Sequence, residues 1–179
     1  MTDIVGVRAS ATLSNCGRYR YELRRAWGRE QGRWVGFVML NPSTADAEQD
    51  DPTIRRCMGF ARAWGYEGIV VVNLFAYRAT RPKNMMVARD PVGLYNYDAI
   101  TNMVRHVALT NKELRGPVVC AWGANGSFMQ QGETVRSWIE NEAVTPHHLG
   151  LTKQGQPRHP LYLRGDIKPI PWQEDNPNE

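Results

Sequence analysis

The stretch WVGFVMLNPS, residues 34–43, indicates the fold most directly. Its first seven residues are almost all apolar, and Asn41-Pro42 then ends the run. A short, continuous apolar run that stops at turn residues is typical of a strand covered on both faces, as in a parallel sheet. We therefore expect residues 34–40 to form an interior strand.

Segments with strand and helix patterns alternate around this strand. We expect strands at residues 18–27, 34–40, 69–75, 118–122 and 148–152, and helices that begin at Asp51-Pro52, near Asn96 and at Ser127. Parallel neighbours need crossover connections, which these helices would supply. The sequence therefore predicts an α/β fold, a three-layer domain with a central, mainly parallel and doubly wound sheet. Residues 18–27 alternate between apolar and charged side chains, as a half-buried edge strand does.

Length and composition limit the class of protein. The chain has 179 residues, 42% of them hydrophobic, which is enough for one buried core and argues against a disordered chain, a fibre or a multi-domain assembly. We expect a single α/β domain over residues 1–172 and an acidic, disordered tail over residues 173–179. No window approaches the run of about 20 apolar residues that a membrane helix needs, and the start of the chain lacks the apolar stretch of a signal peptide. These features predict a cytoplasmic protein, expected to be a monomer, with no membrane partner.

The cysteines and the charges narrow the possible ligands. Three cysteines, odd in number and widely spaced, form neither a disulfide framework nor a zinc ligand set. The formal net charge is +4, and 18 of the 22 basic residues are Arg. Because the guanidinium fork binds phosphate in bidentate fashion, this bias suits a polyanionic partner such as DNA. A GC-rich genome that writes Arg for Lys explains the bias equally well.

Polar residues follow the predicted interior strands, where ligands bind in doubly wound sheets. Asn41 ends the first of them, with Ser43 next to it and Asp46 shortly behind. An amide and a carboxylate can together position a water molecule, so Asn41 and Asp46 are candidate catalytic residues. The alternative is that Asn41-Pro42 is only a turn and Asp51 only a helix cap. Asp46, Asp50 and Asp51 could instead bind Mg²⁺ in a phosphotransfer enzyme.

The segment that follows the next strand, residues 73–82, could bind a nucleobase. Asn73 offers a hydrogen-bond donor and an acceptor to a base edge, and Phe75 or Tyr77 offers a ring to stack on the base. Arg78 and Arg81 could contact phosphates. The alternative for Phe75 is a place in the core.

His159 differs from the other three histidines, because Pro157 and Pro160 stiffen its loop. The cation of Arg158 next to it favours the neutral imidazole. A neutral imidazole can still donate one hydrogen bond to a leaving oxyanion. We therefore take His159 as a third candidate catalytic residue.

Six strings together resemble a bacterial and phage family whose domain is of unknown function. They are MLNPSTAD, DDPTIRR, WGY, NLFAYRAT, VVCAWG and PRHPLYL, within residues 18–163. The order of the motifs also resembles, more distantly, the uracil-DNA glycosylase superfamily and especially its mismatch-specific thymine/uracil branch. In that branch a strand ends in Gly-Ile-Asn-Pro-Gly, which residues 39–43 resemble. Its later Asn followed by an Arg-Thr-Thr-Pro-like stretch resembles residues 73–82, and the superfamily's late His-Pro-Ser loop resembles residues 159–161.

This resemblance implies roles for particular residues. Asn41 would hold the attacking water, Asn73 would read the base edge and His159 would support the departing base. Met39 and Ser43 replace the two glycines of the first motif, so the backbone is expected to approach DNA less closely than in that branch. Leu161 replaces the serine of the late motif and could act as an apolar wedge in the base stack.

Residues and resemblance together predict a DNA glycosylase-like hydrolase with a uracil-DNA glycosylase-like fold. It would cleave the N-glycosidic bond of a modified or mismatched base that has been flipped out of DNA, as in base excision, without a metal or an organic cofactor. Arginines at the rim would bind DNA, among them Arg78, Arg81 and Arg158. Two alternatives stay open: a non-catalytic module that binds DNA or modified nucleotides, and the metal-dependent phosphotransfer enzyme.

Overall fold

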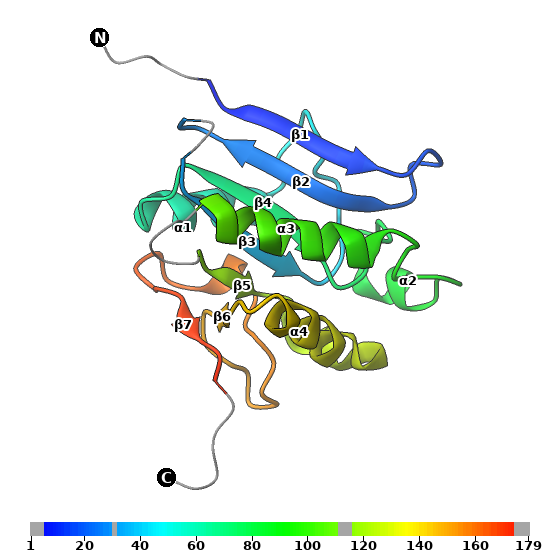
Figure 1. The fold of residues 1–179 in the computed structure, drawn as a ribbon. Helices are drawn as coiled ribbons and strands as arrows, with labels where there is room; N and C mark the ends of the chain where they lie inside the picture. Colours follow the sequence, from blue (N-terminus) through cyan, green and yellow to red (C-terminus); the bar gives the residue numbers. More distant parts are fainter. Residues whose placement is uncertain (1–5, 30–31, 111–115, 174–179) are drawn as a thin grey trace, which may run out of the picture.

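Strand β3 (Trp34–Met39) lies near the middle of the sheet, and all six of its residues are buried. In the computed structural model, which describes residues 6–29, 32–110 and 116–173, it pairs in parallel with β4 on one side and with β5 on the other. The expected interior strand at residues 34–40 is therefore confirmed. Its apolar character follows from helices that cover both faces of the sheet (Figure 1).

The described residues form one sheet of seven strands in the order β1-β2-β4-β3-β5-β6-β7. The other strands are β1 (Arg8–Leu13), β2 (Arg20–Ala26), β4 (Gly68–Asn73), β5 (Val118–Cys120), β6 (Pro146–His148) and β7 (Ile170–Pro171). The four inner strands β4, β3, β5 and β6 are parallel. Strand β2 pairs antiparallel with β4, β1 pairs antiparallel with β2, and β7 pairs antiparallel with β6, so the sheet is mixed, with a parallel centre and antiparallel pairs at its margins.

Strand β2 is not the edge strand that its alternating pattern predicts. Strand β1 pairs with it on the outer side, and both Arg20 and Arg25 are only 2% exposed. An arginine can occupy a buried position where its guanidinium finds carbonyl or carboxylate partners. The charged residues of this segment were therefore a poor guide to its exposed face.

The helices form one layer on each face of the sheet. They are α1 (Pro52–Ala63), α2 (Pro82–Met86), α3 (Asn96–Thr110) and α4 (Gln131–Asn141), with the 3₁₀ segments η1 (Ala124–Gln130) and η2 (Pro160–Tyr162). Helix α1 begins as expected, because Asp51 Oδ1 accepts the N–H of Ile54 at 2.8 Å. Ser127 does not cap a helix, since it lies inside η1 and α4 begins four residues later.

The direction of the chain through the sheet explains why the helices lie on opposite faces. The chain passes from β3 through α1 to β4 on one side, and from β4 through α3 to β5 on the other. Crossover connections are right-handed, so a reversal of direction moves the helix to the other face. Helix α1 packs on one core cluster, and α3 and α4 pack on the other (Figure 1). The connections that leave β3 and β5 therefore diverge, which is the point where such sheets bind ligands.

Three further features concern the cysteines, the length of the helices and the end of the chain. All three cysteines are free, and Cys57 and Cys120 are buried. None of the helices in the described part of the chain is long and apolar enough to cross a membrane. The predicted tail over residues 173–179 lies, from residue 174 onward, outside the described residues.

Candidate functional site

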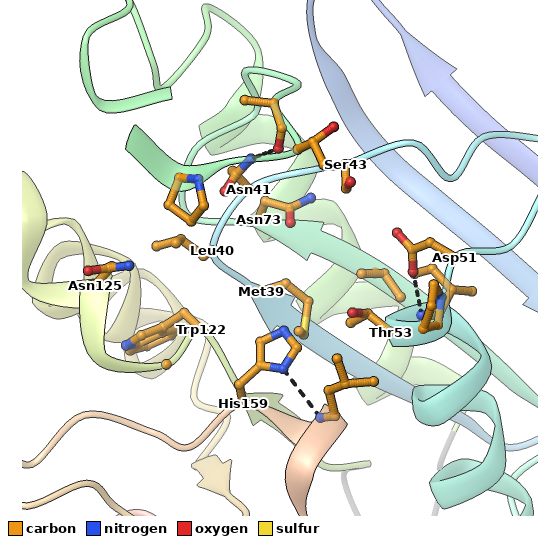
Figure 2. A pocket seen from close by; sticks show the side chains of 18 of the residues that line it. Met39, Leu40, Asn41, Ser43, Asp51, Thr53, Asn73, Trp122, Asn125 and His159 are labelled. Atoms are coloured by element: carbon orange, nitrogen blue, oxygen red, sulfur yellow. Dashed lines mark hydrogen bonds between the residues drawn. The ribbon is translucent and has the colours of Figure 1, made fainter. Parts of the chain in front are cut away.

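A cavity of about 560 Å³ lies at the carboxyl ends of β3, β4 and β5, within the size range of small-molecule sites (Figure 2). Three of the sequence-predicted candidates, Asn41, Asn73 and His159, line it together. Ser43 and Leu161 line it as well. Segments that are more than 30 residues apart in the sequence thus meet where the connections of the sheet diverge.

Asn73 is the last residue of β4, and its side chain has no hydrogen-bond partner among the described residues. The residue is 1% exposed, and neither the amide nitrogen nor the amide oxygen makes a hydrogen bond. Its backbone carbonyl is held separately, by the side-chain amide of Asn96 at 3.0 Å. Buried polar groups are nearly always hydrogen-bonded, so this amide is an exception that a ligand or an ordered water would explain. It offers one donor group and one acceptor to the cavity.

Asn41 follows β3 and is held by its own turn. Its Nδ2 donates to the carbonyls of Ala79 at 2.7 Å and Pro42 at 3.1 Å. The two segments are also joined by a backbone bond from Ala79 N–H to the carbonyl of Pro42. Because the nitrogen is occupied, Oδ1 is the atom left for a water molecule or a ligand. Asn41 is thus part of a rigid turn and a residue of the cavity at the same time.

His159 presents a defined tautomer to the cavity. Its Nδ1 accepts the backbone N–H of Leu161 at 3.3 Å, so the proton of the neutral ring lies on Nε2. Burial lowers the pKa of His159, and the carboxylate of Asp51 opposes that shift only in part. The neutral ring is therefore favoured at pH 7, with Nε2–H available as a donor.

Two further residues of the cavity were not predicted as site residues. Arg20 is 2% exposed, its NH1 donates to the carbonyl of Ala45 at 2.6 Å, and its Nε has no partner. Burial lowers the pKa of Arg20 to about 10, although Asp51 acts in the opposite direction. Trp122 lies two residues after the end of β5, and its indole N–H donates to Gln156 Oε1 at 2.9 Å. The only signal for Trp122 was its place at the end of the strand expected at residues 118–122, which core tryptophans share.

The rings expected to stack on a base lie elsewhere. Phe75 is fully buried in the core under α3, with its ring centroid 5.4 Å from that of Phe128. Side chains of a strand alternate between the two faces of the sheet, but this alternation ends at Leu74, just after β4. The successive side chains of Leu74 and Phe75 therefore both lie in this core. Tyr77 packs edge-on against Tyr19 at 5.7 Å. Neither ring lines the cavity, and Trp122 takes the place that we had expected for them.

The acidic residues behind Asn41 stabilise the loop and do not gather into a site. Asp46 lies outside the cavity, and its Oδ1 accepts the N–H groups of Glu48 and Gln49, which lowers the pKa of Asp46. Asp50 pairs with Arg25 at 2.8 Å. Asp51 lines the cavity but caps α1. Asp46 therefore does not join Asn41 in the lining of the cavity, because local backbone N–H groups hold its carboxylate.

The same contacts bear on the alternative in which Asp46, Asp50 and Asp51 bind Mg²⁺, because each of these carboxylates has a partner of its own. Within residues 6–29, 32–110 and 116–173, no group of three or more His, Cys, Asp or Glu side chains could hold a metal ion. The three acids expected to do so point to three different partners: an Asx-type turn, an arginine and a helix end.

The arginines expected to bind DNA lie around the cavity and not in its lining. Arg81 is exposed between Thr80 and Pro82, which both line the cavity, and Arg158 is exposed next to His159. Arg78 is half-buried, and its NH1 donates to the carbonyl of Gly17 at 3.1 Å. Arg81 and Arg158 are thus free to meet a polyanion, while Arg78 has a partner of its own.

Comparison with known proteins gives a family without an activity. The model of the family described as "Protein of unknown function (DUF1643)" matches residues 20–161. This span begins and ends on residues of the cavity and includes every residue that lines it. No curated protein and no solved structure matches the chain. The expected membership in a family of unknown function is confirmed, and the resemblance to the uracil-DNA glycosylase superfamily stays a hypothesis.

Proposed function

We propose that this chain, which belongs to the DUF1643 family, hydrolyses the N-glycosidic bond of a modified or mismatched base that has been flipped out of DNA into the cavity. The observation that carries the proposal is the unpartnered amide of Asn73. A buried polar group without a partner costs about 1–3 kcal/mol, which a ligand with a matching donor and acceptor would recover. The edge of a nucleobase has that pair of groups.

Asn41 and His159 supply what the reaction needs on either side of the scissile bond. Asn41 Oδ1 orients a water molecule, whose oxygen forms a bond to C1′ of the sugar. The bond from C1′ to the base nitrogen breaks and the base leaves with the electron pair. The water loses one proton as it becomes the hydroxyl of C1′, and the base takes up one proton, so that the step balances. His159 Nε2–H donates a hydrogen bond to the base as negative charge develops on it.

The positive charge that develops on the sugar needs a partner of its own. Asp46 lies outside the cavity, and Asp51 is engaged in capping α1. A phosphate of the DNA itself then stabilises the sugar cation. Trp122, which lines the cavity with its buried ring, supplies the apolar contact to the base in place of Phe75 or Tyr77.

A second function deserves a direct test, because one observation favours it. A module that binds DNA or a modified nucleotide without cleaving it would need Asn73 and Trp122 but no carboxylate beside the water. The location of Asp46 outside the cavity fits such a module. The two functions share a ligand and differ only in whether a base is released.

The deciding experiment incubates the protein with DNAs that carry different modified or mismatched bases and measures released bases by mass spectrometry. We expect release of one class of base by the wild-type protein, loss of release in Asn41→Ala and no effect of a chelator. DNA that shifts in a gel but yields neither free base nor alkali-labile sites would establish the binding module instead. Release that stops with the chelator would contradict a reaction without a metal.

A further inference from the structure

Strand β2 contains an irregularity beside the cavity. Thr12 of β1 pairs with Glu22, but the next residue, Leu13, pairs with Arg20, so Tyr21 is an extra residue in β2. Such a bulge reverses the side to which the following side chains point. It occurs two positions before Leu23, where β2 begins its regular pairing with β4.

The bulge moves Arg20 from one face of the sheet to the other. Glu22 and Arg24 line a groove next to the first turn of α3, as side chains two residues apart should. With unbroken alternation Arg20 would point to the same groove. Tyr21 occupies that side, and Arg20 lines the cavity near Asn73.

No carboxylate in the described part of the chain forms an ion pair with the buried guanidinium of Arg20. Among the described residues, the only hydrogen bond of its side chain goes to the carbonyl of Ala45, and its Nε has no partner. The largest influence of opposite sign comes from Asp51, which is engaged in capping α1, and Asp46 adds a smaller one. Burial lowers the pKa of Arg20 even so, which means that the charged form lacks a sufficient partner.

Two other features of the same cavity favour an anion. The first turn of α1, a helix of 12 residues, lines the cavity through Thr53 and Ile54, and helix N-termini attract negative charge. The volume of about 560 Å³ also leaves room for more than a base. The carboxylate of Asp51 acts against an anion at this end, so the guanidinium of Arg20 has to outweigh it.

We propose that Arg20 binds a phosphate group of the ligand, so that the cavity takes a nucleotide with one of its phosphates and not a nucleobase alone. This inference rests on the proposed function, because it assumes that the ligand is a nucleotide unit. The planar fork of an arginine suits a phosphate, and an anion at this position would give the buried cation its missing partner. The phosphate belongs either to the DNA chain on one side of the flipped base or to the end of a free nucleotide.

The first test uses inorganic phosphate and the intact protein. At constant ionic strength set with sodium chloride, phosphate at about ten times its dissociation constant should raise the melting temperature of the wild-type protein by about 3 °C. Arg20→Gln should lose this shift, and Arg20→Lys should retain only part of it. The control is Arg89→Gln, which removes the same charge from an exposed residue outside the cavity and should keep the full shift.

The source of the phosphate is found with three further ligands. Thymidine has no phosphate, its 5′-monophosphate has a terminal one, and the unphosphorylated trinucleotide of thymidine has only internal ones. Wild-type affinity at least about tenfold higher for the monophosphate than for thymidine, removed by Arg20→Gln, supports a free nucleotide. The same preference for the trinucleotide supports a strand of DNA.

The inference is wrong if phosphate shifts the wild-type protein no more than chloride does, or if Arg20→Gln responds to phosphate as the wild type does. The wild-type titration decides this even where both variants at position 20 fail to fold. Failure of the inference about phosphate can be distinguished from failure of the proposed function. Base release by Arg20→Gln at the wild-type rate, without a phosphate effect, would overturn only the inference. A phosphate effect without base release from any DNA would overturn only the proposed function.

Discussion

Arg20 and Arg25 lie on the same strand and are equally buried, yet their guanidinium groups differ in the number of partners that they have. Arg25 pairs with Asp50 at 2.8 Å and donates to backbone carbonyls on both sides, including those of Arg24 and Asp46. Among the described residues, the guanidinium of Arg20 makes one hydrogen bond, to the carbonyl of Ala45. One guanidinium is therefore satisfied within the fold, and the other is left partly open at a cavity.

This difference separates a structural region from a functional one along a single loop. In the loop between β3 and α1, the carbonyl of Asp46 and the carboxylate of Asp50 bind the guanidinium of Arg25. The first residue of the same loop that lines the cavity with a polar side chain is Asn41. A fully bonded network stabilises the loop, so the cavity can keep unpaired groups at fixed positions. Buried polar groups without partners lower the stability of the fold, but they can bind a ligand. Such a loss of stability in favour of function is frequent at functional sites.

The largest effect on stability should come from Arg25. Arg25→Met removes the partner of Asp50 and of several carbonyls, and we expect the free energy of unfolding to fall by about 3 kcal/mol. Arg20→Met should lower it by about 1 kcal/mol or less, since the lost hydrogen bond is offset by the removal of a poorly paired buried charge. Urea denaturation of both variants measures the difference. Equal losses would show that the two arginines have the same structural role.

The next effect concerns the rate of reaction. Asn41→Ala should lower base release by about 10²–10³-fold, because a group that orients the water acts mainly in the transition state. Its affinity for DNA should stay near that of the wild type. Arg158→Ala should do the reverse and weaken binding with a smaller effect on the saturated rate, because a cation next to a phosphate stabilises the ground and transition states about equally. Wild-type turnover by purified Asn41→Ala would remove the role proposed for Asn41.

The buried strands and the capped helix could be predicted from the sequence because their signals are local. The apolar run of residues 34–40 and the pair Asp51-Pro52 each specify one structure almost regardless of their surroundings. Strands β1 and β7 have no such signal. The residues of β1 are mostly exposed, and β7 has only two residues, so their pairing depends on neighbours that are distant in the sequence.

Part of the site could be predicted for a similar reason. Asn41 and Asn73 directly follow buried strands, and parallel strands bring their carboxyl ends to one edge. The position of Arg20 depends on a bulge opposite Leu13, which pattern alone does not indicate. Phe75 was misplaced because the strand alternation stops one residue before it.

A smaller and opposite pair of effects should separate two buried asparagines, Asn73 at the end of β4 and Asn96 at the start of α3. Asn96→Ala loses bonds from Nδ2 to the carbonyls of Asn73 and Leu74, and we expect its free energy of unfolding to fall by about 2 kcal/mol. Asn73→Ala removes an amide without partners, so stability should stay the same or rise slightly while affinity for the flipped base falls about tenfold or more. A clear loss of stability in Asn73→Ala would mean that its amide has a structural partner, such as a buried water.

The smallest effect should come from His159 and depends on pH. Burial holds the pKa of His159 below its ordinary value of 6.5, so the unfolded chain takes up the proton at a higher pH than the native protein does. The stability that His159 contributes is therefore complete above about pH 6.5 and is lost as the pH falls from there toward the lowered pKa. The pKa values of His106, His147 and His148 are lowered in the same direction, so the wild-type protein should lose stability steadily over this range. His159→Gln should lose less stability than the wild type between about pH 7 and pH 5, a range above that in which carboxylates titrate. Urea denaturation at several pH values measures both slopes, and equal slopes would mean that the ring of His159 takes up its proton in the cavity as readily as it does in water.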